Sequence, residues 1–190
     1  WTGVYYVLTY ALSLFLILFV TPRLSKKFNT TPTELGLAHL PTFIDIGLAP
    51  IAYVVYIACA NFITSLMSHL PWFNADEAQD VGFNYLAGGG ERVIAMLALV
   101  FIAPIAEEII MRGWLYGKIR SKLKVVPAIL ITSAVFALLH GQWNVAVTTF
   151  MLSIVLCGLR EITGTIWSGI ILHMLSNGVA FYLLYVVGML

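Results

Sequence analysis

The chain alternates long apolar stretches with short polar ones, and this pattern predicts six membrane-spanning helices. A helix that crosses a bilayer needs about 20 mostly apolar residues, and uncharged runs of roughly that length fill most of the sequence. Pro22 follows the first span, and Pro50 predicts a kink near the start of the second. The predicted spans cover roughly residues 3–21, 43–68, 91–117, 126–140, 144–159 and 165–188.

The composition indicates the same class of protein. Hydrophobic residues make up 61% of the 190 and charged residues 10%, with a mean hydropathy of +0.94; a soluble domain has about 25% charged residues. A soluble enzyme, a disordered tail and a nucleic-acid-binding protein are excluded. We therefore expect an all-α, polytopic bundle of about six helices. Cys59 and Cys157 lie in apolar runs and form neither a disulfide framework nor a metal motif.

The positions of the basic residues predict the orientation of the chain. Short cytoplasmic loops are rich in Lys and Arg, whereas the loop after the second span is acidic. We expect the N-terminus and the C-terminus outside and Glu107 in the cytoplasmic half of the third span. The first run is too long for a removable signal peptide and lacks its basic flank, so we expect a mature helix. The basic residues follow the first and third spans: Arg23, Lys26, Lys27, Lys118, Arg120, Lys122 and Lys124.

One length fits the six-span pattern poorly. Residues 125–159 must supply two helices and a turn, which leaves roughly 15 residues for each helix, fewer than the about 20 of an untilted span. Either these helices cross a thinned bilayer, or their junction lies at membrane depth. Non-helical backbone is tolerated there only where protein or water shields it. We favour a junction that faces a cavity.

Three clusters of polar residues lie inside the apolar spans, where ionisable groups are costly and mark functional sites. Glu107 and Glu108 are adjacent in the third span, and Glu108 shares a helix face with Arg112. One carboxylate suffices to neutralise Arg112, so the second predicts chemistry. His140 ends the fourth span, four residues after Phe136.

His173 and Asn177 lie on one face of the last span, four residues apart. A lone histidine or asparagine at such a position is common in helix packing. Taken together, however, a carboxylate, two imidazoles and an amide can hydrogen-bond around a wet cavity. Such a group can activate water and stabilise an oxyanion.

The ordered motifs Glu107-Glu108-x-x-x-Arg112, Phe136-x-x-x-His140 and His173-x-x-x-Asn177 resemble those of the CPBP/Abi intramembrane proteases. This family includes the type II CAAX prenyl endopeptidases and proteins like lysostaphin-resistance protein A. The resemblance covers roughly residues 90–180 and implies a four-helix catalytic core. We accordingly divide the chain into N-terminal helices and an extracytoplasmic loop at 1–90 and a catalytic core at 91–190, within one membrane domain.

The resemblance also implies roles for individual residues. Glu107 would be the general base, His140 would help to hold the attacking water, and His173 and Asn177 would stabilise the oxyanion. Glu108, Arg112 and Phe136 would support the site. It further implies an intramembrane endopeptidase that needs no cofactor. A zinc-dependent version with Glu107, His140 and His173 as ligands is the alternative, because a catalytic zinc site takes three protein ligands and a water.

Two other functions remain open at this stage. A non-catalytic bacteriocin-immunity or scaffold protein would need the fold without the base. A small transporter could use the buried acid for proton relay, although no inverted repeat is visible. The expected partners are the lipid bilayer and a membrane-associated peptide or protein substrate, with no nucleic acid. The expected location is a prokaryotic cell membrane, which the chain crosses several times.

If Glu107, His140 and His173 form one site, they must lie at similar depths in the membrane. At 1.5 Å per residue, Glu107 lies about 16 Å from the cytoplasmic end of its span and His173 about 14 Å from the end of its own. His140 lies about 24 Å from the start of its span. His140 is therefore too deep to meet the other two unless its helix tilts, starts late or leans into the cavity.

Overall fold

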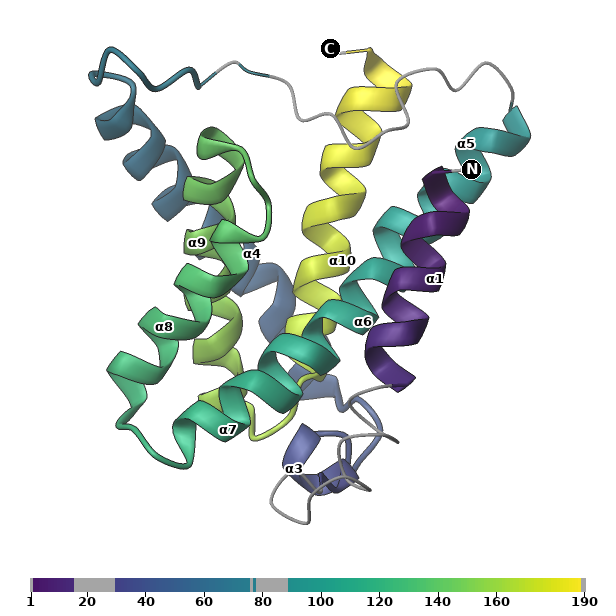
Figure 1. Ribbon diagram of the computed structural model, residues 1–190, viewed down its shortest axis with the longest axis vertical. Coiled ribbons are helices and arrows are strands. Elements are labelled where there is room, and N and C mark those ends of the chain that lie inside the picture. The colour runs from purple at the N-terminus through teal and green to yellow at the C-terminus, as the bar shows by residue number, and fades with distance from the viewer. Residues whose placement is uncertain (1, 16–29, 76, 78–88, 189–190) are drawn as a thin grey trace.

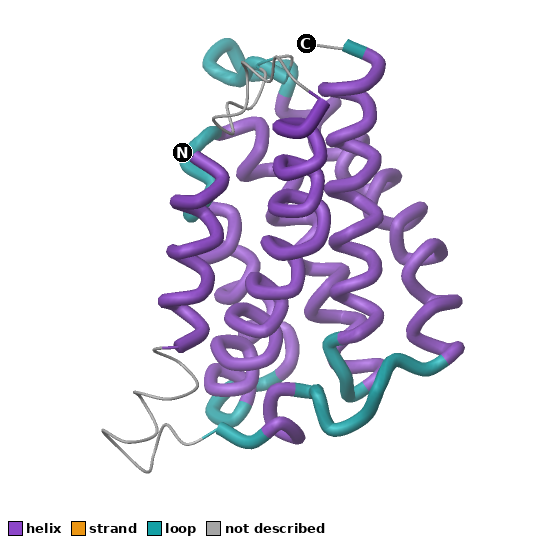
Figure 2. The backbone as a smooth tube through the Cα atoms, turned by 90° about the vertical axis from the view of Figure 1, so that its right-hand side faces the viewer, coloured by secondary structure: helices purple, strands orange, loops and turns teal. Residues whose placement is uncertain are grey.

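The computed structural model describes residues 2–15, 30–75, 77 and 89–188, and all regular structure in these residues is helical. Six helical rods lie side by side (Figures 1 and 2). The predicted all-α bundle is confirmed. The end of the first predicted span and its basic residues lie outside the described residues. The rods are α1 (Thr2–Phe15), α4 (Phe43–Met67), a continuous rod from Gly89 to Arg120, α8 (Val125–Leu138), α9 (Trp143–Thr163) and a rod from Trp167 to Val187.

Among the described residues, four rods are long and apolar enough to cross a membrane, and α8 is a shorter apolar helix. The chain is thus a multi-pass membrane protein, as predicted. In the most apolar part of Arg92–Arg120, 39% of the residues are buried inside the protein, compared with 22–28% in the other three long rods. Arg92–Arg120 is therefore the central rod, and the others expose more of their surface to lipid.

The central rod crosses the bundle obliquely (Figure 1) and contains two π-helical stretches. It consists of α5 (Gly89–Met96), the π-helix η3 (Leu97–Ile102), α6 (Ala103–Glu108), the π-helix η4 (Ile109–Leu115) and α7 (Tyr116–Arg120). In η3 the Ala103 N–H bonds the Ala98 carbonyl, five residues back. Pro104, the next residue, has no N–H. With the same spacing of five residues, the Leu99 carbonyl would accept from the N–H of residue 104. Because residue 104 is proline, the Leu99 carbonyl has no helical donor.

The N-terminus of α4 is tied to the start of α10 (Trp167–Phe181) by a buried carboxylate. Asp45 is 2% exposed and forms a capping box with Thr42. Its Oδ1 accepts hydrogen bonds from the hydroxyls of Thr165 at 3.0 Å and Ser168 at 2.7 Å. Farther along, α4, α9 and α10 pack through small and aliphatic side chains, which allow close approach of membrane helices. The buried members of this core are Ala49, Ala52, Tyr56, Ala60, Leu152, Leu156, Leu159 and Leu172.

A short helix, α3 (Pro32–Leu35), docks at the end of the bundle where α7 ends (Figure 1). Gly36 closes α3 with φ of 77°, and a Cβ at this position would lie 2.8 Å from the Arg160 guanidinium. Arg160 Nη2 donates to the Glu34 carbonyl at 2.9 Å, and Leu35 packs against Gly113 in η4. The segment before α4 therefore covers this end of the central rod.

The structure corrects the predicted division of residues 125–159. Helix α9 continues to Thr163, so it has 21 residues and is about 32 Å long, while α8 has 14 residues and is about 21 Å long. Only α8 is short. The charged pair Arg160 and Glu161 lies inside α9, and Glu161 accepts hydrogen bonds from Tyr116 and Arg120, which explains why the helix does not end before it.

The turn between α8 and α9 is held by the segment that follows α4. The rings of Trp72 and Trp143 meet edge to face, with centroids 5.8 Å apart. Asn144 Nδ2 donates to the Glu77 carbonyl. In Figure 1 this turn lies below the upper end of η5 (Tyr182–Val187). The expectation that the junction lies at membrane depth and faces a cavity stays a prediction.

Replacing Asp45 by Ala should lower the free energy of unfolding by about 2–4 kcal/mol, because the Thr165 and Ser168 hydroxyls lose a buried charged acceptor. Unfolding in mixed detergent and sodium dodecyl sulfate measures this change. Asn61→Ala, at an exposed position of the same helix, is the control and should change stability little. Equal stability of the Asp45→Ala and Asn61→Ala proteins would show that this link is unimportant.

Candidate active site

The central rod carries a fully buried ion pair. Glu108 ends α6 and Arg112 lies in η4, and both residues are 0% exposed. Arg112 Nη1 lies 2.9 Å from Glu108 Oε1. Glu107 points in another direction and keeps 18% of its side chain exposed. The two adjacent carboxylates therefore face different surroundings, as their helical positions predict.

His173, on α10, lies between the two carboxylates. Its Nδ1 is 2.9 Å from Glu108 Oε1, and its Nε2 is 3.7 Å from Glu107 Oε2. Since a carboxylate oxygen only accepts, Nδ1 carries the proton of the shorter contact. One oxygen of Glu108 thus accepts from both Arg112 and His173. This arrangement fixes the ring and presents Nε2 to Glu107.

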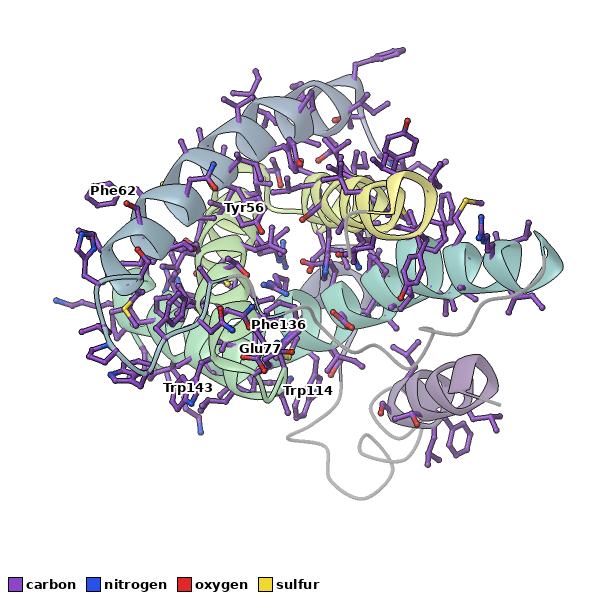
Figure 3. The ribbon with its side chains drawn as sticks, turned by 90° about the horizontal axis from the view of Figure 1, so that it is seen from above. Tyr56, Phe62, Glu77, Trp114, Phe136 and Trp143 are labelled. Carbon is purple, nitrogen blue, oxygen red and sulfur yellow. The ribbon has the colours of Figure 1, made fainter. Side chains whose placement is uncertain are left out.

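Phe136, on α8, connects the motifs through ring contacts. The Arg112 guanidinium carbon lies 4.4 Å from the centre of the Phe136 ring, which is a cation–π distance. The centres of the His173 and His140 rings lie 5.9 and 4.8 Å from the centre of the Phe136 ring. Figure 3 shows Phe136 inside the ring of helices, whereas Phe62 points outward. The predicted supporting role of Phe136 therefore has a geometric basis.

His140 lies just beyond the end of α8. Its Nδ1 is 2.8 Å from the Phe136 carbonyl, and since a carbonyl only accepts, Nδ1 donates and Nε2 remains as an acceptor. The helix starts at Val125, so it does not start late. His140 and His173 both contact the Phe136 ring.

Asn177 lies one turn beyond His173 and binds the backbone of η3. Its Nδ2 donates to the Leu99 carbonyl at 2.9 Å, the carbonyl that Pro104 leaves without a helical donor. An unpaired carbonyl in a membrane is costly, so Asn177 stabilises the break in the central rod. A side-chain amide has two N–H donors, and this contact uses one of them.

Sequence reasoning missed two residues that shape the site. Pro104 creates the acceptor for Asn177, and the proline inside an apolar span was the available signal. Gly169 lies one turn before His173, and a Cβ there would come within 3.0 Å of Glu108 Oε2. A side chain at position 169 would displace the Glu108 carboxylate. The sequence signal for Gly169 was its position four residues before His173, which places both on the same face of α10.

The residues expected to hold zinc in the alternative prediction are Glu107, His140 and His173. Glu107 and His173 face each other, and the rings of His173 and His140 both contact Phe136. Within the described part of the chain, however, no group of three or more His, Cys, Asp and Glu side chains is arranged to hold a metal ion. The positions of these side chains thus do not fit the zinc alternative.

Neutralising one member of the buried Glu108–Arg112 pair should destabilise the fold more than neutralising both. Glu108→Gln or Arg112→Met alone leaves one uncompensated charge and should lower the free energy of unfolding by about 3–5 kcal/mol. The double variant should recover part of this loss, because neither charge remains.

The Arg120–Glu161 pair is the control. Its side chains are 40% and 30% exposed, so Arg120→Met and Glu161→Gln should each cost less than about 1 kcal/mol. The same detergent unfolding assay compares all variants. Equal losses for the two pairs would contradict a special role for Glu108 and Arg112.

The chain resembles a known family over the segment that holds this site. The model of a family described as type II CAAX prenyl endopeptidase Rce1-like matches residues 89–179, which is just under half of the chain and runs from the start of α5 into α10. All the motif residues from Glu107 to Asn177 lie inside the matched segment. No curated protein and no solved structure matches the chain. Residues 89–179 are therefore similar to the type II CAAX prenyl endopeptidase Rce1-like family, in agreement with the resemblance that the sequence motifs indicate.

Proposed function

We propose that this protein is an intramembrane endopeptidase in which Glu107 activates a water molecule to attack a peptide bond. The observation that carries the proposal is the pair of contacts made by His173. Its Nδ1 is anchored on the buried Glu108, and its Nε2 faces Glu107 at 3.7 Å. This distance is longer than a hydrogen bond, so an oxygen atom beside both groups can bind to each of them.

The reaction proceeds in two steps. Glu107 takes a proton from water while the water oxygen attacks the carbonyl carbon, and the carbonyl oxygen becomes an oxyanion. His140 Nε2 accepts the second hydrogen of the water and holds it in place. The oxyanion then collapses, the C–N bond breaks, and the leaving nitrogen receives its proton from Glu107. Glu107 thus ends in its starting state.

The oxyanion needs hydrogen-bond donors, and α10 supplies them. Protonated His173 donates through Nε2, while Nδ1–H stays on Glu108. The second N–H of Asn177 is the other donor, since the first binds the Leu99 carbonyl. With His173 protonated, the charges of Glu107, Glu108, Arg112 and His173 sum to zero. A neutral set of charges lowers the cost of placing the site within the membrane.

The substrate class follows from where the site lies. Glu107 and His173 are on membrane-spanning rods, so the scissile bond must come from a membrane-associated peptide or protein. The matched family is described by prenyl endopeptidase activity. Prenylated and non-prenylated substrates are both compatible with this chemistry, because Glu107 and His173 act on the peptide bond.

Glu107→Gln should abolish cleavage while the protein still inserts and accumulates. The amide keeps the shape of the side chain but cannot accept the proton, and loss of a general base slows a reaction by about 100- to 10,000-fold. Comparative analysis of peptide termini in membrane fractions detects the products. Glu161→Gln, a carboxylate outside the site, is the matched control and should cleave normally.

Full cleavage by a well-inserted Glu107→Gln protein would overturn the proposal. Survival of a protective or scaffolding effect in that variant, with no cleavage in the wild type, would support the non-catalytic alternative. Loss of cleavage on chelation, with recovery on adding zinc, would support the zinc-dependent version instead.

Asn177→Asp should lower the cleavage rate by about 100-fold or more, because an oxyanion donor is lost. It should also destabilise the fold by about 1–3 kcal/mol, since the new carboxylate oxygens face the Leu99 carbonyl without a donor. Cleavage kinetics and detergent unfolding measure the two effects. Asn74→Asp, at an exposed loop position, serves as the control. An unchanged cleavage rate in Asn177→Asp would remove Asn177 from the mechanism.

A further inference from the structure

Beside the Glu108–Arg112 pair lies a group of buried polar atoms that meet no hydrogen-bond partner among the described residues. Two of them belong to Arg112, whose Nε and Nη2 carry N–H donors on the side of the guanidinium that Glu108 does not use. The hydroxyls of Thr132 and Ser153 also lack partners, and both residues are 0% exposed. These donors point to a site that the catalytic arrangement does not use.

The packing brings these atoms to one place between η4, α8 and α9. Thr132 lies on the α8 face that carries Ala128 one turn before it and Phe136 one turn after it. Ala128 packs against Cys157, and Phe136 lies under the Arg112 guanidinium. Thr132 is therefore at the level of Cys157 and Arg112 along the bundle.

Ser153 approaches the same space from α9. It lies one turn before Cys157 on the same helix face, and the Cys157 thiol interacts with the side chains of both Ser153 and Arg112. A thiol is only a weak hydrogen-bond acceptor. It does not replace the oxygen acceptors that a buried guanidinium requires.

Leaving guanidinium N–H groups without acceptors in a membrane protein is costly. Water meets the need, because it accepts from Arg112 and donates to a hydroxyl oxygen at the same time, and buried waters typically make about three hydrogen bonds. A bound anion fits less well, since the Glu108 carboxylate already neutralises Arg112 at 2.9 Å.

We propose that Thr132 and Ser153 bind one or more buried water molecules against the free edge of Arg112 and act as positioning residues for His173. The water site keeps the guanidinium on Glu108, and Glu108 in turn keeps the Nδ1–H of His173. The effect on catalysis rests on the proposed function, whereas the effect on the His173–Glu108 hydrogen bond does not.

The experiment measures that hydrogen bond directly. The Nδ1–H proton of His173 is observed by nuclear magnetic resonance in the full-length protein in nanodiscs, and its signal is assigned by its loss in His173→Gln. Thr132→Val and Ser153→Ala each remove one hydroxyl. Thr132→Ser keeps the hydroxyl at position 132. Thr149→Val is the matched control, because the Thr149 hydroxyl binds the Val145 carbonyl of its own helix.

We expect the Nδ1 proton to exchange with water about tenfold faster in Thr132→Val and Ser153→Ala, as it would if the bond weakened by about 1.4 kcal/mol. Thr132→Ser should restore slow exchange, and Thr149→Val should leave it unchanged. For a peptide whose cleavage requires Glu107, kcat should fall in the first two variants while KM stays the same.

Unchanged proton exchange in both Thr132→Val and Ser153→Ala would overturn the water site, whatever their cleavage rates. Equally fast exchange in Thr149→Val would also overturn it, because the effect would then be a general loosening of the bundle. If Glu107→Gln still cleaves, the proposed function fails, but the proton exchange still decides whether the water site exists.

Discussion

The burial of Glu108 and Arg112 within a membrane-spanning rod is the constraint on which the rest of the site depends. Each charge alone would be very costly there, so the pair must stay together, and its 2.9 Å contact joins the end of α6 to η4. The same Glu108 oxygen then binds His173, which brings α10 to the central rod. Phe136 covers the guanidinium and brings α8. Three helices are therefore positioned around a single ion pair.

Breaks in regular helix geometry also serve the site. The π-helical register of η3 and the missing N–H of Pro104 leave the Leu99 carbonyl in need of a donor, and Asn177 provides it. Such irregular backbone is tolerated at membrane depth only when protein groups satisfy it. A residue that sequence analysis assigns to an oxyanion therefore also holds two rods together. The two roles are compatible because an amide carries two N–H groups.

The helices and the polar residues could be predicted from the sequence because both depend on local patterns. Apolar run lengths predicted six helices, four of which are long enough to cross a membrane among the described residues, and helical spacing placed Glu108 with Arg112 and His173 with Asn177. The π-helical register, the extension of α9 through Arg160 and Glu161, and the need for glycine at 169 could not be predicted in this way. Each depends on a partner from another helix: Asn177 for η3, Tyr116 and Arg120 for α9, and Glu108 for Gly169.

The end of the short helix α8 places His140 against the Phe136 ring. At about 21 Å, α8 is shorter than the about 30 Å hydrocarbon core of a bilayer. The turn that follows α8 is held by the contact of Trp72 with Trp143 and by the hydrogen bond from Asn144 to the Glu77 carbonyl. The Phe136 ring thus brings together His140 at the end of α8, the Arg112 cation of the central rod and His173 of α10.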